Sequence, residues 1–176
     1  MNIIITMPLI VAGIIALLLL IALFMKREHY VKREIIINAP RQKVFDYIKL
    51  LKNQDAFNTG AMEDPGRKRE FKGTDGTVGY VYAWSGNKNA GVGEKEIINI
   101  VEGCSIETEI RFVKPMAATA TIIMETDSLT DNQTRVAWSN AGTLKYPVNI
   151  MIPIMEKSVA KGMDTSLSAL KNILEK

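Results

Sequence analysis

The first 25 residues of the chain carry no charged side chain. From residue 3 to residue 25, only Thr6, Pro8 and Gly13 are neither strongly apolar nor alanine. A helix of this length measures about 34 Å, enough to cross a hydrocarbon layer of about 30 Å. The pattern predicts a transmembrane anchor over residues 1–25. A cleaved signal peptide fits less well because its apolar stretch is shorter and follows basic residues, and a core helix would carry some charge.

A basic juxtamembrane segment follows at residues 26–33, with four Lys or Arg against one Glu. Basic residues stay on the cytoplasmic side of a membrane. We therefore expect a single-pass protein of the cell (inner) membrane, with the N-terminus outside and the soluble domain in the cytoplasm. Its first partner would be the lipid bilayer, whose anionic headgroups attract this segment. His29 is expected at the membrane interface.

The remaining residues, 34–176, are predicted to form one soluble domain. The β-branched run over residues 31–37 predicts a strand, and the apolar stripe over residues 41–51 predicts a short helix. Residues 53–66 are polar and contain turn signals. From residue 67 to about residue 139, apolar and polar positions alternate, and short turns separate about six further strands, which favours an antiparallel sheet.

The chain ends in a long amphipathic helix, and its apolar face is marked at intervals of three and four residues by Val159, Met163, Leu167, Leu170 and Leu174. The element order is thus strand, helix, strand meander and long helix. This order predicts an α+β fold in which a curved antiparallel sheet wraps around the C-terminal helix. Because a helix cannot pack flush along a strongly curved sheet, we expect a cavity between the two.

Composition removes several function classes. One Cys and one His exclude a disulfide framework and multi-histidine or thiolate metal sites, so neither a metal nor another cofactor is expected. The net charge of +3 is too small to indicate a nucleic-acid partner. A protein partner is left unidentified by these data.

Several segments resemble a known family. Residues 35–48 resemble the opening strand and helix of the helix-grip superfamily, which is also called START-like or SRPBCC. The hairpin residues Trp84, Ser85, Gly86 and Asn87, followed by Gly91 and Gly93, resemble the tryptophan–glycine–asparagine signature of its polyketide cyclase/dehydrase branch. Residues 112–115 and 134–138 and Gly162 are further matches. The resemblance covers residues 30–176 and implies a helix-grip fold with a pocket for lipids, polyketides or similar hydrophobic molecules.

The candidate ligand-binding residues follow from the alternation and from the approach to the last helix. They are Tyr80, Tyr82, Trp84, Trp138, Asn140, Met151, Met155 and Val159. Aromatic rings with polar tips and adaptable methionines suit a hydrophobic pocket. The alternatives are that the aromatic residues belong to the sheet core, that the methionines fill the core, which is the favoured interpretation for them, and that Asn140 faces solvent beside a turn. Two pairs of carboxylates, Glu94 with Glu96 and Glu107 with Glu109, fit a solvated outer face. The run from residue 67 to residue 69 (Arg-Lys-Arg) indicates a solvated strand start.

Three functions remain open on the sequence alone. The favoured one is a membrane-anchored START-like domain that binds a hydrophobic small molecule or lipid without covalent chemistry. The second is a polyketide cyclase/dehydrase-type enzyme, which would need at least two titratable groups converging in the cavity. No catalytic constellation is identified, so the sequence favours binding over catalysis. The third is a protein-interaction module whose cavity has collapsed.

Overall fold

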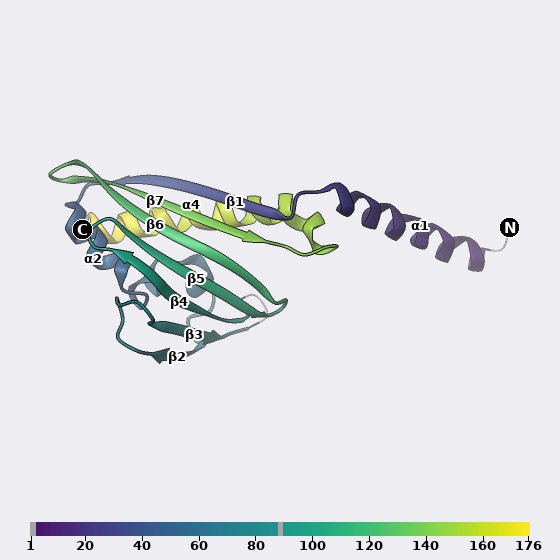
Figure 1. The fold of residues 1–176 in the computed structure, drawn as a ribbon, viewed down its shortest axis with the longest axis horizontal. Coiled ribbons are helices and arrows are strands. Elements are labelled where there is room, and N and C mark those ends of the chain that lie inside the picture. Colours follow the sequence, from purple (N-terminus) through teal and green to yellow (C-terminus); the bar gives the residue numbers. More distant parts are fainter. Residues whose placement is uncertain (1–2, 88–89) are drawn as a thin grey trace.

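The computed structural model describes residues 3–87 and 90–176 (Figure 1). A seven-stranded antiparallel sheet forms most of the domain, and a long helix crosses its concave side. The helical segments are α1 (Ile3–Phe24), α2 (Arg41–Lys49), η1 (Asn53–Ala56), α3 (Thr59–Met62), η2 (Val148–Met151) and α4 (Ile152–Leu174). The strands are β1 (Glu28–Ile37), β2 (Lys68–Lys72), β3 (Val81–Ser85), β4 (Val92–Val101), β5 (Ser105–Lys114), β6 (Ala118–Thr130) and β7 (Gln133–Thr143).

The sheet has the order β1-β7-β6-β5-β4-β3-β2, with every neighbouring pair antiparallel. The six strands of the predicted meander are therefore confirmed, and β1 completes the edge beside β7. β1 begins at Glu28, three residues before the predicted start, because Glu28 to Tyr30 pair with Ala141 to Thr143. Most of the basic juxtamembrane segment is thus part of a strand.

Curvature of the sheet follows from interrupted pairing. Register shifts occur in β4 against β5, between Val92 and Gly93 and again between Ile97 and Asn99. Such bulges bend a strand and increase its twist, so the sheet curls around α4 (Figure 1). The α+β helix-grip architecture predicted from the sequence is confirmed.

The main core lies between the concave face of the sheet and helices α2 and α4. Met163, Leu167, Leu170 and Leu174 are buried on one face of α4, as the spacing predicts, and Val159 packs against the same cluster half-buried. Tyr80 is almost wholly buried in that core. Because α4 fills the space in front of β1 and its neighbours, little room is left directly beneath it.

Helix α1 projects from one end of the sheet, away from the C-terminus (Figure 1). Its 22 residues span about 33 Å, and the window Met7–Phe24 is apolar and almost wholly exposed. Its C-terminal end is fastened to the domain by Asn149, a fully buried residue of η2. The Asn149 side-chain amide donates to the carbonyls of Ala22 at 2.7 Å and Met25 at 3.1 Å. These bonds satisfy carbonyls that the end of a helix leaves without partners.

Candidate ligand-binding site

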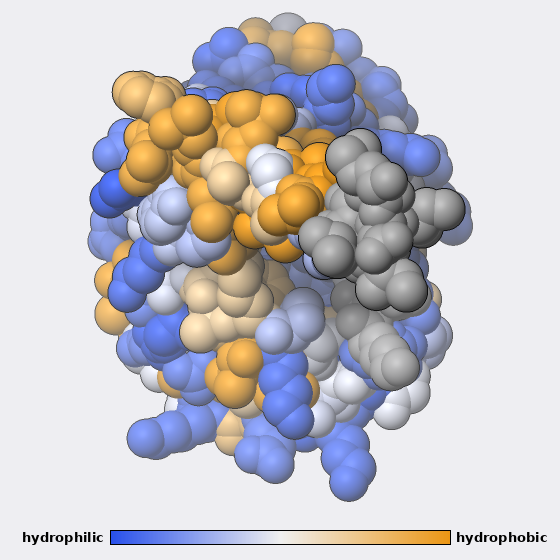
Figure 2. Space-filling model, turned by 90° about the vertical axis from the view of Figure 1, so that its right-hand side faces the viewer, coloured by the Kyte–Doolittle hydropathy of each residue, from blue (hydrophilic) through white to orange (hydrophobic). Residues whose placement is uncertain are grey.

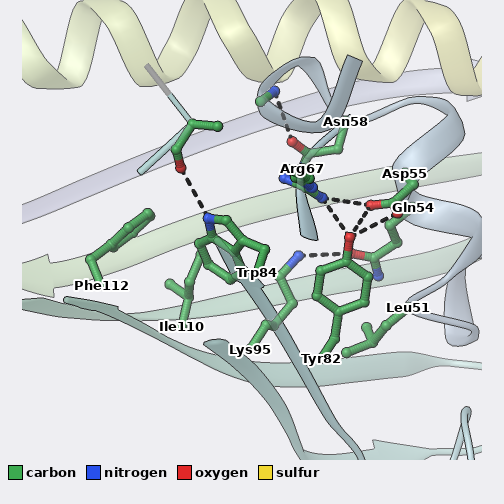
Figure 3. A pocket seen from close by; sticks show the side chains of 12 residues that line it. Leu51, Gln54, Asp55, Asn58, Arg67, Tyr82, Trp84, Lys95, Ile110 and Phe112 are labelled. Atoms are coloured by element: carbon green, nitrogen blue, oxygen red, sulfur yellow. Dashed lines mark hydrogen bonds and ion pairs between the residues drawn. The ribbon is translucent and has the colours of Figure 1, made fainter. Parts of the chain in front are cut away.

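A pocket with a volume of about 180 Å³ lies beside α4, between the sheet and the η1–α3 segment (Figure 3). Its walls come from β3, β4 and β5, and its roof from Leu51, Gln54, Asp55, Asn58 and Gly60. No residue of α4 lines it. We expected a cavity between the sheet and the last helix. The pocket instead lies closer to β3, because the side chains of α4 fill the space between α4 and the sheet.

Two rows of side chains across three paired strands form the wall. Lys95 lies between Tyr82 and Ile110 in one row, and Gly93 lies between Trp84 and Phe112 in the next. A Cβ at Gly93 would lie 2.8 Å from the Trp84 ring, so glycine there lets the indole lie flat against the sheet.

The Trp84 indole Nε1 donates to the carbonyl of Ala90 at 2.9 Å. Trp84 also meets Phe112 edge to face, with the ring centroids 5.7 Å apart. The tryptophan and glycine positions noted in the hairpin thus fix one aromatic wall of the pocket.

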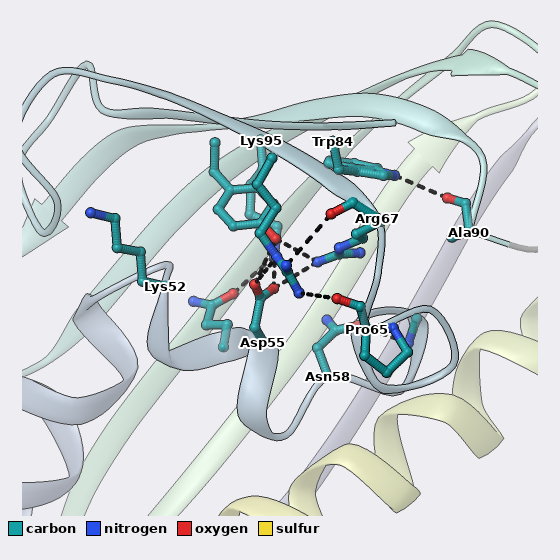
Figure 4. A network of polar contacts seen from close by, with 12 residues as sticks. Lys52, Asp55, Asn58, Pro65, Arg67, Trp84, Ala90 and Lys95 are labelled. Carbon is teal, nitrogen blue, oxygen red and sulfur yellow. Dashed lines mark hydrogen bonds and ion pairs between the residues drawn. The ribbon is translucent and has the colours of Figure 1, made fainter. Parts of the chain in front are cut away.

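Asp55 organises the polar end of the pocket (Figure 4). Its carboxylate accepts from Arg67 Nη2 at 2.6 Å, from Arg69 Nε at 2.8 Å and from the Tyr82 hydroxyl at 2.7 Å. Arg67 Nη2 also donates to the Tyr82 oxygen at 2.7 Å. The Arg67 side chain is only 9% exposed, and its guanidinium lies over the rings of Tyr82 and Trp84. One carboxylate therefore holds two guanidinium groups and a phenol around the pocket.

Lys95 supplies a second buried cation. Its side chain extends from β4 toward the roof, where Nζ donates to Gln54 Oε1 at 2.9 Å (Figure 3). Burial lowers the pKa of Lys95 to about 8, and the positive charge of Arg67 acts in the same direction. Burial also raises the pKa of the Tyr82 phenol, and its hydrogen bond to Asp55 adds to the rise. The pocket thus combines an apolar wall with a cationic end.

The predicted ligand-binding residues do not all line one pocket. Tyr82 and Trp84 line the pocket, whereas Tyr80 and Trp138 lie in the core. Trp138 packs edge to face against Phe57, with the ring centroids 6.3 Å apart.

The other four candidates lie outside this pocket. Asn140 is half-buried and its Oδ1 lies 2.9 Å from Nε2 of His29, whose side chain is buried within the domain. Met151 is 53% exposed near the end of α1, and Met155 and Val159 are half-buried along α4. A ligand contact for any of these residues stays a prediction.

The carboxylate pairs predicted for the outer face do lie there, and they form a structural cluster. Glu94, Glu96 and Glu109 all pair with the guanidinium of Arg111. The hydrogen bonds that Arg111 donates to these glutamates, first of all the one to Glu96, raise its pKa. These three carboxylates are thus held by one guanidinium on the convex side, away from the pocket. Among the described residues, no group of three or more His, Cys, Asp or Glu side chains is placed to hold a metal ion.

The polar end of the pocket was not predicted from the sequence. Arg67 was expected at a solvated strand start, but its side chain turns inward because Asp55 lies opposite it. Lys95 did leave a signal, since the alternation places it on the inward face between Gly93 and Ile97. A lysine at an apolar position of a half-buried strand indicates a buried, functional cation or a covering polar partner.

Comparison with known proteins places the fold. No protein-family model and no curated protein matches the chain. Among solved structures, norcoclaurine synthase from Thalictrum flavum, in complex with dopamine and hydroxybenzaldehyde, matches with a TM-score of 0.63 and 13% identity over 88% of this chain and 90% of that chain. This chain has the helix-grip fold.

Two bacterial structures are similar to the same extent. A protein from Chromobacterium violaceum matches with a TM-score of 0.61 and 14% identity, over 84% of this chain and 97% of that chain. The Aha1 dimer from Colwellia psychrerythraea matches with a TM-score of 0.58 and 14% identity, over 84% and 96%. At these identities the likeness concerns the fold alone, so function must be argued from the pocket.

The stability of the ligand-free protein should depend on pH through Lys95. The folded-state pKa of about 8 lies below the ordinary value of 10.5, so unfolding takes up a proton between these two pH values. Stability should therefore rise between pH 8 and pH 10.5. Lys95→Met removes the buried charge, and we expect it to be more stable than the wild type by roughly 1–3 kcal/mol at pH 7. This advantage should shrink toward zero by pH 10.5.

Urea unfolding of the full chain in detergent micelles, followed by tryptophan fluorescence, measures both effects. Lys72→Met is the matched control because Lys72 is exposed on the edge strand β2. Its free energy of unfolding should stay within about 0.5 kcal/mol of the wild type at every pH. A constant difference between Lys95→Met and the wild type across this pH range would contradict a buried lysine.

Proposed function

We propose that this protein is a membrane-anchored helix-grip domain that binds a small, ring-sized hydrophobic molecule in the pocket beneath η1 and α3. The observation that carries the proposal is the pocket wall of Trp84, Ile110 and Phe112, closed at one end by buried polar groups. Ligand sites are mostly apolar with a few placed polar groups that fix orientation. An interaction module with a collapsed cavity is less well supported, because this space is not filled.

The volume of the pocket limits the ligand. A cavity of about 150 Å³ accommodates benzene, whereas drug-sized ligands occupy roughly 300–1,000 Å³. The pocket volume of about 180 Å³ suits one ring with a small substituent. Lipid binding, which the sequence also suggested, is a less favourable match because an acyl chain or sterol needs much more space.

Attachment to a membrane is supported by how α1 joins the domain. Cleavage of α1 as a signal peptide would remove the carbonyls that accept from Asn149, and a fully buried amide would lose its partners. Figure 2 looks onto the end of the molecule from which α1 projects and shows apolar surface gathered there, with α1 as part of it. Met116 is exposed between β5 and β6, Tyr146 and Met151 between β7 and α4, and Ile154 in the first turn of α4. Such side chains suit contact with the membrane interface. Following the basic flank at residues 26–33, the domain would lie in the cytoplasm.

Catalysis is a second candidate, because the titratable groups Asp55, Tyr82 and Lys95 converge on the pocket. An enzyme of the polyketide cyclase/dehydrase type would need at least two titratable groups that converge in its cavity. A lysine with a pKa of about 8 is in the range for proton transfer near neutral pH. A binding domain would release its ligand unchanged and an enzyme would not, which mass spectrometry of the released molecule distinguishes.

The single cysteine reports the predicted topology. Cys104 is exposed in the turn between β4 and β5, so a membrane-impermeant maleimide can reach it from the side on which the domain lies. We expect labelling in inside-out membrane vesicles and none in right-side-out vesicles. The matched control combines Cys104→Ala with Asn2→Cys, which moves the thiol to the N-terminal flank and should reverse the pattern. Labelling of Cys104 in right-side-out vesicles would contradict a cytoplasmic domain.

Ring binding can be measured with 4-fluorotoluene by fluorine NMR on the full chain in nanodiscs. We expect saturable binding with a dissociation constant on the order of 0.1–1 mM, given eight heavy atoms and moderate ligand efficiency. Ile110→Trp should abolish it because the larger side chain fills the pocket. Ile98→Trp, on the exposed face of β4, is the control and should bind as the wild type does. Near-UV circular dichroism verifies that both variants fold, and wild-type binding that never saturates would contradict the proposal.

A further inference from the structure

The charges around the pocket do not balance. Arg67 and Lys95 are the two cationic residues among those that line the pocket, and Asp55 is the one acidic residue among them. The Asp55 carboxylate bonds to Arg67 and to Arg69 beside the pocket. Lys95 donates to the neutral amide of Gln54 and pairs with no carboxylate in the described part of the chain, so Asp55 favours its charged form only through space. Buried cations are normally paired directly with anions, and Lys95 departs from that rule.

Arg67 also has an unused donor. Its Nε is buried and has no hydrogen-bond partner, and the side chain as a whole is about nine-tenths buried. A buried N–H without an acceptor costs free energy comparable with a lost hydrogen bond. The donor belongs to a guanidinium held over the rings of Tyr82 and Trp84, at the boundary between the aromatic wall and the polar end. A ligand atom that accepts a hydrogen bond there would satisfy it.

Arg111 on the outer face of the sheet provides a contrast. Its guanidinium is paired with three glutamates, so its charge is more than balanced without any ligand. On the convex side of the sheet, Arg111 therefore has more acidic partners than its charge requires. On the concave side, the pocket has fewer acidic than basic side chains. The shortage of acidic partners is specific to the pocket and not a general feature of the domain.

We propose that the natural ligand is a small aromatic or cyclic carboxylate, with its carboxylate between Arg67 and Lys95 and its ring against Trp84, Ile110 and Phe112. This inference rests on the proposed function and names the chemical class of its ligand. Arginine and lysine together bind a carboxylate through charge-assisted hydrogen bonds, which are stronger than neutral ones. The ring contacts supply apolar burial, and the cationic end fixes the orientation.

The test compares two probes of nearly equal size, 4-fluorobenzoate and 4-fluorobenzamide, by fluorine NMR on the full chain in phosphatidylcholine nanodiscs. At pH 7 we expect the carboxylate to bind at least about tenfold more tightly than the amide. Lys95→Met should remove most of this preference; it also removes the hydrogen bond to Gln54, so near-UV circular dichroism verifies that the variant folds. Lys72→Met changes the net charge equally at an exposed site and should keep the wild-type preference.

Binding of the carboxylate should also weaken as the pH rises past 8, because Lys95 then loses its proton. The other charged or titratable groups at this end are Asp55 on η1, Arg67 before β2, Arg69 on β2 and Tyr82 on β3. The phenol stays protonated in this range because burial raises its pKa. Amide binding, by contrast, should not change between pH 7 and pH 9.

The possible outcomes test the carboxylate inference, the ring-binding function and the role of Lys95 separately. Equal affinity for the two probes in the wild type overturns the carboxylate inference but leaves the ring-binding function in place. Saturable binding of neither the probes nor 4-fluorotoluene overturns both. A preference that survives in Lys95→Met removes the assigned role of this lysine. Loss of carboxylate affinity in discs rich in phosphatidylglycerol identifies a lipid headgroup as the occupant and overturns the proposal of a small free acid.

Discussion

The shared carboxylate of Asp55 is the contact on which the pocket depends. It ties η1 to the strand residues Arg67, Arg69 and Tyr82, and so fixes the roof of the pocket over the sheet. The ion pair is partly buried, with Arg67 9% exposed and Asp55 23% exposed. Removing one partner of such a pair leaves the other charge desolvated and alone, which is more costly than the pair is stabilising. One carboxylate thus sets both the shape of the pocket and the position of the guanidinium groups at its polar end.

A second constraint joins helix α1 to the domain. Only residues 25–27 separate α1 from β1, and Asn149 holds the end of the helix. The backbone N–H of Leu144 donates to the carbonyl of Arg27 at 2.8 Å, and Lys26 pairs with Glu156 on α4. The domain is therefore attached to α1 through several contacts and not through a long linker. If α1 spans a bilayer, these contacts hold the domain in a defined orientation at the membrane surface.

The sequence could predict the fold because the fold follows from local periodicity. The alternation around Tyr82 and Trp84 and the spacing of Met163 and Leu167 correctly indicate strands and the final helix. The pocket could be predicted only in part. Its aromatic wall follows from the alternation, but its polar end joins Asp55 to Arg67 and Gln54 to Lys95 across the fold. A sequence of 19 acidic and 22 basic residues does not show which of them meet, because those contacts depend on how the η1–α3 segment folds back over the sheet.

The pKa of the Lys95 ammonium, measured by NMR at its Cε carbon in the full chain with and without 4-fluorobenzoate, tests the buried cation and the anion site together. We predict a pKa of about 8 in the free protein, since burial disfavours the charged form. We also predict a clear rise in this pKa when the carboxylate binds, because an adjacent anion favours the charged form. An ordinary pKa near 10.5 that the probe leaves unchanged would contradict both the buried cation and the anion site.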